Sequence, residues 1–172
     1  MKPHDFLGLP DGWESLLDKR LLIAQTDPLR RKAYICSPCR ADTSDGVYGN
    51  MLAVRYYMYY VYMNMKKCPC APHAYLPAIL NDREVRERNL ALKFGKELLT
   101  IADELLVCGH ILTDGMIGEI KKAAELGLPV IAYSPGLPEE IEDKTGLSVQ
   151  YDDRHVALTL NAGELFIREA AV

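Results

Sequence analysis

The sequence predicts an α/β protein built around a parallel sheet. Two stretches carry this prediction, because in each an apolar run of strand length is followed by a polar loop and then by a helix. The first is Lys32–Ser37, followed by a helix from about Tyr48 to Lys66. The second is Ala102–Gly109, followed by a helix that opens at Asp114. Repetition of strand, loop and helix is typical of βαβ units, in which successive strands run parallel.

The composition bounds the class of protein. The chain has 172 residues, of which 49% are hydrophobic and 26% charged, enough for one compact domain with a sizeable core. The net charge of -4 argues against a nucleic-acid binder that relies on bulk electrostatics. No apolar run is long enough to span a membrane, and the N-terminus lacks the apolar segment of a signal peptide. With five cysteines and no export signal, we expect reduced thiols and a cytoplasmic location.

Residues 1–31 are predicted to form a helical appendage, and residues 32–172 the α/β domain. In the appendage, large apolar residues recur at helical spacing and stop before Pro28. They are Trp13, Leu16, Leu17, Leu21 and Leu22. We expect this helix to pack on the main domain or on a second subunit.

The helix at 48–66 is unusual because tyrosine and methionine occupy every face of it. A helix that is apolar all round is normally covered on both sides. We therefore expect one side to lie on the sheet and the other to meet a second copy of the chain, giving a homo-oligomer. A base-stacking surface needs basic residues among the rings, and the sequence supplies only Arg55, Lys66 and Lys67.

Four cysteines raise the question of a zinc site. Cys36 and Cys39 flank the end of the first strand, and Cys68 and Cys70 begin the second. In parallel strands these two positions lie at opposite edges of the sheet, roughly 15 Å apart at about 3.3 Å per residue. We therefore expect no metal and no cofactor, and interpret the thiols as buried or incidental.

The remaining elements follow in order. A charged helix starts near Asp82, with a buried stripe expected from Val85, Leu92, Leu98, Leu99 and Ile101. A strand at 129–133 and a short helix at 138–144 come after the Asp114 helix. Strand character is present at 148–151 and again at 156–160, while the tail from 162 to 172 is ambiguous.

The candidate site lies between the strand that ends at Gly109 and the helix that opens on Asp114 and Gly115. In open α/β sheets, ligands bind where strand C-termini meet helix N-termini, and the helix dipole adds a positive field there. Glu119 sits just inside that helix, so we expect it to be held ionised. Gly118 costs roughly 1 kcal/mol of helix propensity, which suggests a steric reason for its presence. In the plainer interpretation Asp114 is only an N-cap and Glu119 only an acid favoured by the dipole.

Five segments together resemble a group of small proteins of unassigned function, common in firmicutes and their phages. That group is similar in turn to the nucleoside 2-deoxyribosyltransferases. The resemblance covers roughly residues 32–133. The segments are Tyr34–Arg40, Ala71–Leu76, Gly95–Leu99, Asp103–Gly109, and Gly115–Met116 with Glu119–Ile120.

The resemblance implies a doubly wound, flavodoxin-like parallel sheet and an N-glycosidase or transferase that acts on a nucleoside or nucleotide. In the transferases a glutamate after strand three attacks the anomeric carbon, and by motif this role maps onto Glu119. The first-strand loop of that family lines the sugar and base. The substrate-binding residues expected by this mapping and by position are Ser37, Pro38, Cys39, Arg40, His73, Gly109, His110, Gly115 and Met116.

Two departures from the transferase pattern affect the expected chemistry. Cys39 stands where an aromatic residue is usual, which removes a stacking contact to the base. Gly109 and His110 stand near the point where the transferases place an acid. The candidates for the leaving-group acid are therefore Asp114, His73 and His110, in that order. A lone histidine such as His73 also fits a purely structural role.

Three hypotheses follow. The first is the glycosyl-transferring or glycosyl-hydrolysing enzyme, with Glu119 as nucleophile and Asp114 as its partner; Arg40 favours a phosphorylated substrate. The second is a non-catalytic protein that binds a nucleotide or an ADP-ribose-type ligand in the same pocket. The third is an interaction protein that works through the tyrosine-rich helix.

Overall fold

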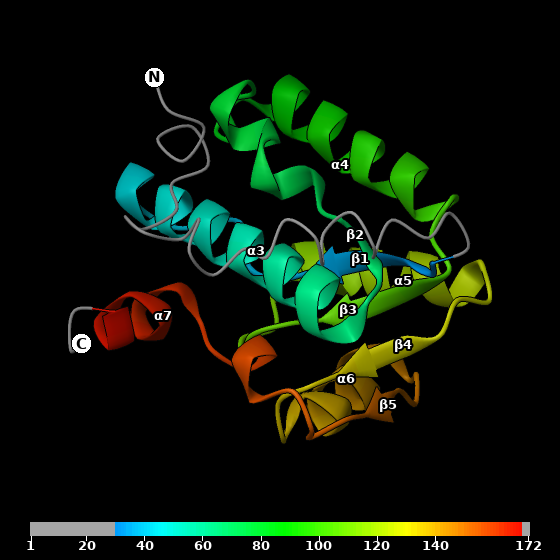
Figure 1. Ribbon diagram of the computed structural model, residues 1–172. Coiled ribbons are helices and arrows are strands. Elements are labelled where there is room, and N and C mark those ends of the chain that lie inside the picture. Colours follow the sequence, from blue (N-terminus) through cyan, green and yellow to red (C-terminus); the bar gives the residue numbers. More distant parts are fainter. Residues whose placement is uncertain (1–29, 170–172) are drawn as a thin grey trace.

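The computed structural model describes residues 30–169 as a five-stranded parallel sheet with helices on both faces (Figure 1). The helix expected between Trp13 and Leu22 lies outside the described residues. The strands are β1 (Lys32–Cys36), β2 (Cys68–Cys70), β3 (Glu104–Val107), β4 (Val130–Ala132) and β5 (Gln150–Tyr151). The helices are α3 (Ser44–Met65), α4 (Val85–Leu99), α5 (Asp114–Glu125), α6 (Leu137–Thr145) and α7 (Ala162–Glu169).

The strand order is β2-β1-β3-β4-β5, and every pair is parallel. This order is that of the flavodoxin-like doubly wound sheets, and it confirms the predicted fold class. The chain reverses its direction of winding between β1 and β3, which makes this pair the topological switch point. The register also sets Cys68 level with Lys32 at the start of β1, far from Cys39 beyond its end. Within residues 30–169, no three side chains of His, Cys, Asp or Glu are close enough to hold a metal ion.

Alternation along the central strands divides the core into two layers. Ala33 and Ile35 of β1 pack with residues of α3 and α7, while Tyr34 and Cys36 pack with residues of α4, α5 and α6. From Ala33 onward, both sides of β1 are buried, and so are both sides of β3, as expected for strands covered by helices on both faces.

Helix α3 begins earlier than predicted because Thr43 caps it. The Thr43 hydroxyl accepts a hydrogen bond from the backbone of Gly46 at 3.1 Å, and Lys66 ends the helix in the left-handed conformation. One side of α3 packs on the sheet as predicted, through Met51, Ala53, Val54, Tyr57 and Val61. Within the described part of the chain, no helix is both long and apolar enough to cross a membrane.

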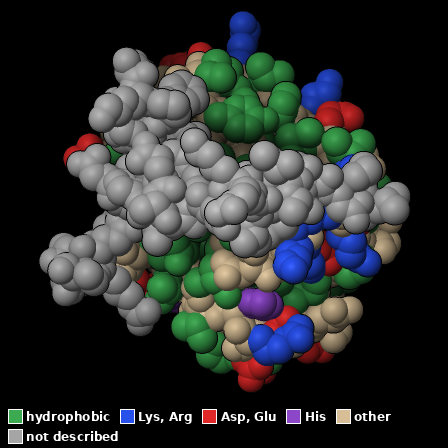
Figure 2. Space-filling model, in the orientation of Figure 1, with side chains coloured by type: hydrophobic (Ala, Val, Ile, Leu, Met, Phe, Trp, Pro, Cys, Tyr) green, Lys and Arg blue, Asp and Glu red, His purple; other side chains and the backbone are tan. Residues whose placement is uncertain are grey.

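Two local predictions were wrong. The stretch at 156–160 is not a strand, because Val156–Leu158 forms a 3-10 turn that brings Leu158 into the core. The buried stripe of α4 was also misplaced: Val85 is 71% exposed, Leu92 38% and Ile101 60%, and only Leu99 is fully buried. Helix α4 contacts the sheet mainly through its C-terminal end, so most of its apolar residues face outward. Figure 2 shows hydrophobic side chains gathered over α4 and the turns that precede it.

The uneven burial of α4 predicts different effects for two leucines of one helix. Leu99→Ala removes a fully buried side chain and lowers the free energy of unfolding by about 2–5 kcal/mol. Leu90 is 55% exposed, so Leu90→Ala changes it by less than about 0.5 kcal/mol. Urea unfolding of both variants measures this, and equal losses would contradict the observed packing of α4.

Candidate functional site

A cavity of about 530 Å³ lies where β1, β2 and β3 end, beside the topological switch point. We call it the switch-point cavity. Its wall consists of residues from the loop after β1, the turn after β2, α4 between Glu87 and Gly95, and the first turns of α5. Carboxyl ends of parallel strands leave such a crevice because the connecting loops diverge to opposite faces of the sheet.

Glu119 lines this cavity from α5, and its carboxylate accepts a hydrogen bond from the Tyr34 hydroxyl at 2.8 Å. Burial raises the pKa of Glu119 to about 7, and hydrogen bonds from Tyr34 and Cys36 oppose that rise. From the sequence we expected the helix dipole to hold Glu119 ionised, and this was wrong, because burial has the larger effect on its pKa. Thr113 is the N-cap, so Glu119 lies in the second turn, beyond the reach of the terminal field.

Gly95 of α4 makes the contact between Tyr34 and Glu119 possible. A Cβ atom at this position would lie 2.9 Å from the Tyr34 hydroxyl oxygen and 3.6 Å from Oε1 of Glu119. The glycine therefore opens the space in which the strand and the two helices α4 and α5 converge. Gly118 has no such role, because nothing lies within 4 Å of a Cβ built there. The steric reason expected for Gly118 was wrong.

Ser37 and His73 form a second polar pair at the cavity. The Ser37 hydroxyl and Nε2 of His73 are 2.8 Å apart, and both side chains are buried. Burial lowers the pKa of His73 to about 4, so the imidazole is neutral at pH 7. Ser37 follows β1 and His73 follows β2, so the sheet topology brings together two residues that are 36 positions apart.

Other predicted site residues reach the same cavity. Cys39 and Arg40 line it from the loop after β1, and Asp114, Gly115 and Met116 line it from the start of α5. Asp114 is exposed and Met116 is buried beneath the cavity wall. Burial and the nearby Asp82 raise the pKa of the Cys39 thiol to about 12, so this thiol stays protonated.

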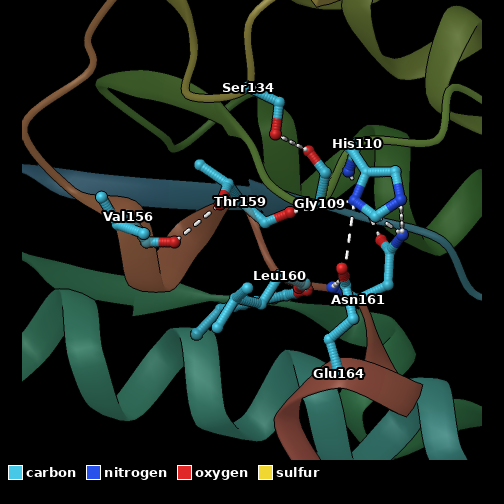
Figure 3. Close-up of polar contacts among 9 residues, drawn as sticks. Gly109, His110, Ser134, Val156, Thr159, Leu160, Asn161 and Glu164 are labelled. Atoms are coloured by element: carbon cyan, nitrogen blue, oxygen red, sulfur yellow. Dashed lines mark hydrogen bonds and ion pairs between the residues drawn. The ribbon is translucent and has the colours of Figure 1, made fainter.

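Three predicted residues are not among those that line the cavity: Pro38, Gly109 and His110. Gly109 has a φ of +79°, donates its N–H to Leu158 and accepts a hydrogen bond from the Ser134 hydroxyl (Figure 3). His110 instead lies beside Asn161 and Glu164, with Nδ1 3.5 Å from the Glu164 carboxylate (Figure 3). This contact ties the loop after β3 to the start of α7.

Sequence reasoning missed several residues of the cavity. Tyr34 was not among the predicted site residues, although alternation along β1 sets it on the same face as Cys36 and hence toward α5. Asp82 and Arg88, which form an ion pair of 3.2 Å at the cavity, lie where the sequence predicted only the start of a charged helix. Nothing in their spacing signals the cavity, because α4 reaches it only through the fold. Among the described residues that line the cavity, the guanidinium groups are those of Arg40 and Arg88, and Arg88 is paired with Asp82.

The fold and the cavity define a flavodoxin-like α/β protein with a space of small-molecule size at its switch point. The chain belongs to the family described as a domain of unknown function (DUF7768), whose model matches residues 31–133. This matched segment contains Tyr34, Ser37, His73, Gly95 and Glu119. A search of curated proteins found no match.

The backbone of this chain is similar to that of a solved structure described as a 2-deoxyribosyltransferase from the psychrotolerant bacterium Bacillus psychrosaccharolyticus. The two share 19% sequence identity with a TM-score of 0.48. The similarity covers 76% of this chain and 98% of the other.

Alanine substitutions at Gly118 and Gly95 distinguish the effect of helix propensity on stability from the effect of crowding at the Tyr34 hydroxyl. Gly118→Ala fills open space and raises the free energy of unfolding by roughly 1 kcal/mol. Gly95→Ala gains the same propensity but crowds the Tyr34 hydroxyl, so we expect it to be destabilising relative to Gly118→Ala. Denaturant unfolding compares them, and equal stabilisation would show that the space at Gly95 is not needed.

The Tyr34 hydroxyl opposes the rise in the pKa of Glu119 that burial causes. Tyr34→Phe removes a hydrogen bond to the ionised carboxylate, so the pKa of Glu119 rises above about 7. Tyr57→Phe is the matched control, because its hydroxyl bonds the Leu160 carbonyl instead. Carboxyl-carbon NMR titration measures the shift. Because this pKa is raised on folding, the contribution of Glu119 to stability is present at low pH and is lost as the pH rises through about 7.

Proposed function

We propose that the protein is an N-glycosidase or glycosyl transferase of the 2-deoxyribosyltransferase type, acting on a nucleoside or nucleotide with Glu119 as nucleophile. The observation that carries the proposal is the Glu119 carboxylate, which lines an open cavity and is held by the Tyr34 hydroxyl. In the proposed reaction a Glu119 oxygen bonds to the anomeric carbon while the base departs. Water or a second base then displaces the glutamate, and the configuration is retained.

Tyr34 is the proposed positioning residue for the nucleophile. Its hydrogen bond to Oε1 favours the ionised form of Glu119 and fixes the position of the carboxylate. The leaving base needs a proton donor within hydrogen-bond reach. Asp114 remains the first candidate because it lines the cavity, and Asp82 and Glu87 join it as carboxyl groups of the same wall. His73 is neutral and paired with Ser37, and His110 lies with α7.

The proposal extends to the rest of the chain. Residues 32–172 would be the catalytic domain and residues 1–31 a helical appendage. Residues of α3 that do not pack on the sheet, such as the half-buried Tyr59, would contribute to a homo-oligomer. All five cysteines are unpaired, which suits a reducing compartment, so the proposed location is the cytoplasm.

One observation favours a non-catalytic alternative in which the cavity binds a nucleotide or an ADP-ribose-type ligand. With a pKa near 7, Glu119 is substantially protonated at neutral pH. A protonated carboxyl group can hydrogen-bond a ligand but does not attack carbon. Ligand-induced thermal stabilisation that survives in Glu119→Gln, with no product formed by the wild-type protein, would favour this alternative.

Base release from a panel of deoxynucleosides and nucleotides tests the enzymatic proposal. We expect the rate to rise with pH through about 7, since only the ionised carboxylate attacks. Glu119→Gln should lower the rate by about a thousandfold or more. Glu125→Gln, at the exposed end of the same helix, is the control and should behave as wild type. Wild-type release by Glu119→Gln would overturn the proposed nucleophile.

A further inference from the structure

A second hollow adjoins the switch-point cavity and has a volume of about 1130 Å³. We call it the side groove. It runs between α3 and the turns that follow β2, and the two hollows share part of their walls. The shared residues are Arg40, Ala41, Asp42, Pro77, Leu80 and Asp82. The two hollows therefore meet at these six residues.

The charges of the two hollows differ in sign. Among described residues that line only the cavity, the acids are Glu87, Asp114 and Glu119 and the base is Arg88, which is paired with Asp82. Among described residues that line only the groove, the charged side chains are Arg55 and Arg83. The cavity therefore suits a group with positive charge, and the groove side suits negative charge.

The groove also offers aromatic surface. Tyr48 of α3 is 53% exposed and Tyr75 is 42% exposed, and both line it. Tyr75 is held edge-on against Phe94 of α4, with ring centroids 6.3 Å apart. Exposed tyrosine rings beside arginines are suited to stacking a heteroaromatic base while phosphates are neutralised.

We propose that the substrate of this site is a pyridinium dinucleotide, in which a ribosyl-pyridinium is joined through a pyrophosphate to a second nucleoside. The cationic ring would occupy the acidic cavity beside Glu119. Arg40 and Arg83 would bind the pyrophosphate near the common wall, and the second base would lie against Tyr48 and Tyr75. This inference rests on the proposed glycosyl chemistry of Glu119 and narrows its substrate class.

A cationic leaving group removes the need for a proton donor. When a Glu119 oxygen forms a bond to the anomeric carbon, the electron pair of the carbon–nitrogen bond returns to the ring nitrogen. The pyridinium departs as a neutral base, and no proton is transferred. Water then bonds to the anomeric carbon, the ester carbon–oxygen bond breaks with its electrons returning to Glu119, and one proton is released to solvent.

Turnover of three probes by the full chain tests the substrate class: oxidised nicotinamide dinucleotide, nicotinamide riboside and 2′-deoxyadenosine. We expect kcat/KM for release of nicotinamide from the dinucleotide to exceed that from the riboside by about tenfold or more. Release of adenine from deoxyadenosine without turnover of the dinucleotide would overturn the inference and leave the proposed function intact. No release from any of the three probes would overturn the inference, and no release from the wider panel of deoxynucleosides and nucleotides would overturn the proposed function as well.

Variants of the groove test its part in binding. Tyr48→Ala and Arg83→Ala should each lower kcat/KM for the dinucleotide about tenfold more than for the riboside, because only the dinucleotide reaches the groove. Arg86→Ala is the matched control, since Arg86 is an exposed arginine three residues after Arg83, in the first turn of α4, and is not among the residues that line either hollow. Equal effects on both probes, or none, would remove the groove from the site.

Discussion

The hydrogen bond between Tyr34 and Glu119 is the contact on which the candidate site depends. It joins the central strand β1 to α5, and it forms only because α4 presents Gly95 at the crossing point. Gly95 follows Tyr34 by 61 positions, and Glu119 follows Gly95 by 24. The contact therefore fixes β1, α4 and α5 relative to one another although they are far apart in the sequence. The cavity lies directly beside this junction, so its shape is set by the packed core and not by its loops alone.

Two electrostatic effects compete at Glu119, and burial is the larger. A carboxylate in the first turn of a helix is stabilised by the terminal N–H groups, but this effect is confined to that turn. Glu119 is one turn further along, where loss of hydration raises its pKa to about 7. The Tyr34 and Cys36 side chains restore part of the lost hydration as hydrogen-bond donors. The result is a carboxyl group whose ionisation responds to pH in the neutral range.

The sequence predicted the layers of the fold because periodicity is a local property. Strand–loop–helix order predicted the parallel sheet. The family resemblance and the positions of residues at strand ends directed attention to Ser37, His73 and Glu119, which all line one cavity. The exposure of Val85 and the role of Gly95 could not be predicted from the sequence, because both depend on how α4 is placed against the sheet. The turn at Val156–Leu158 has strand-forming residues, but it turns inward to bury Leu158, so tertiary packing overrode local propensity.

The neutral state of His73 matters for the charge of the whole cavity. A buried imidazolium would have added a positive charge beside Ser37, but burial favours the uncharged ring and the Ser37 hydroxyl satisfies its Nε2 atom. The ionised groups of the wall are then mostly carboxylates, and the Arg88 guanidinium is already paired with Asp82. A transition state for glycosyl transfer carries positive charge on the sugar ring. An acidic, partly dehydrated cavity stabilises such charge more than it stabilises a neutral ground state, which is the requirement for catalysis by differential binding.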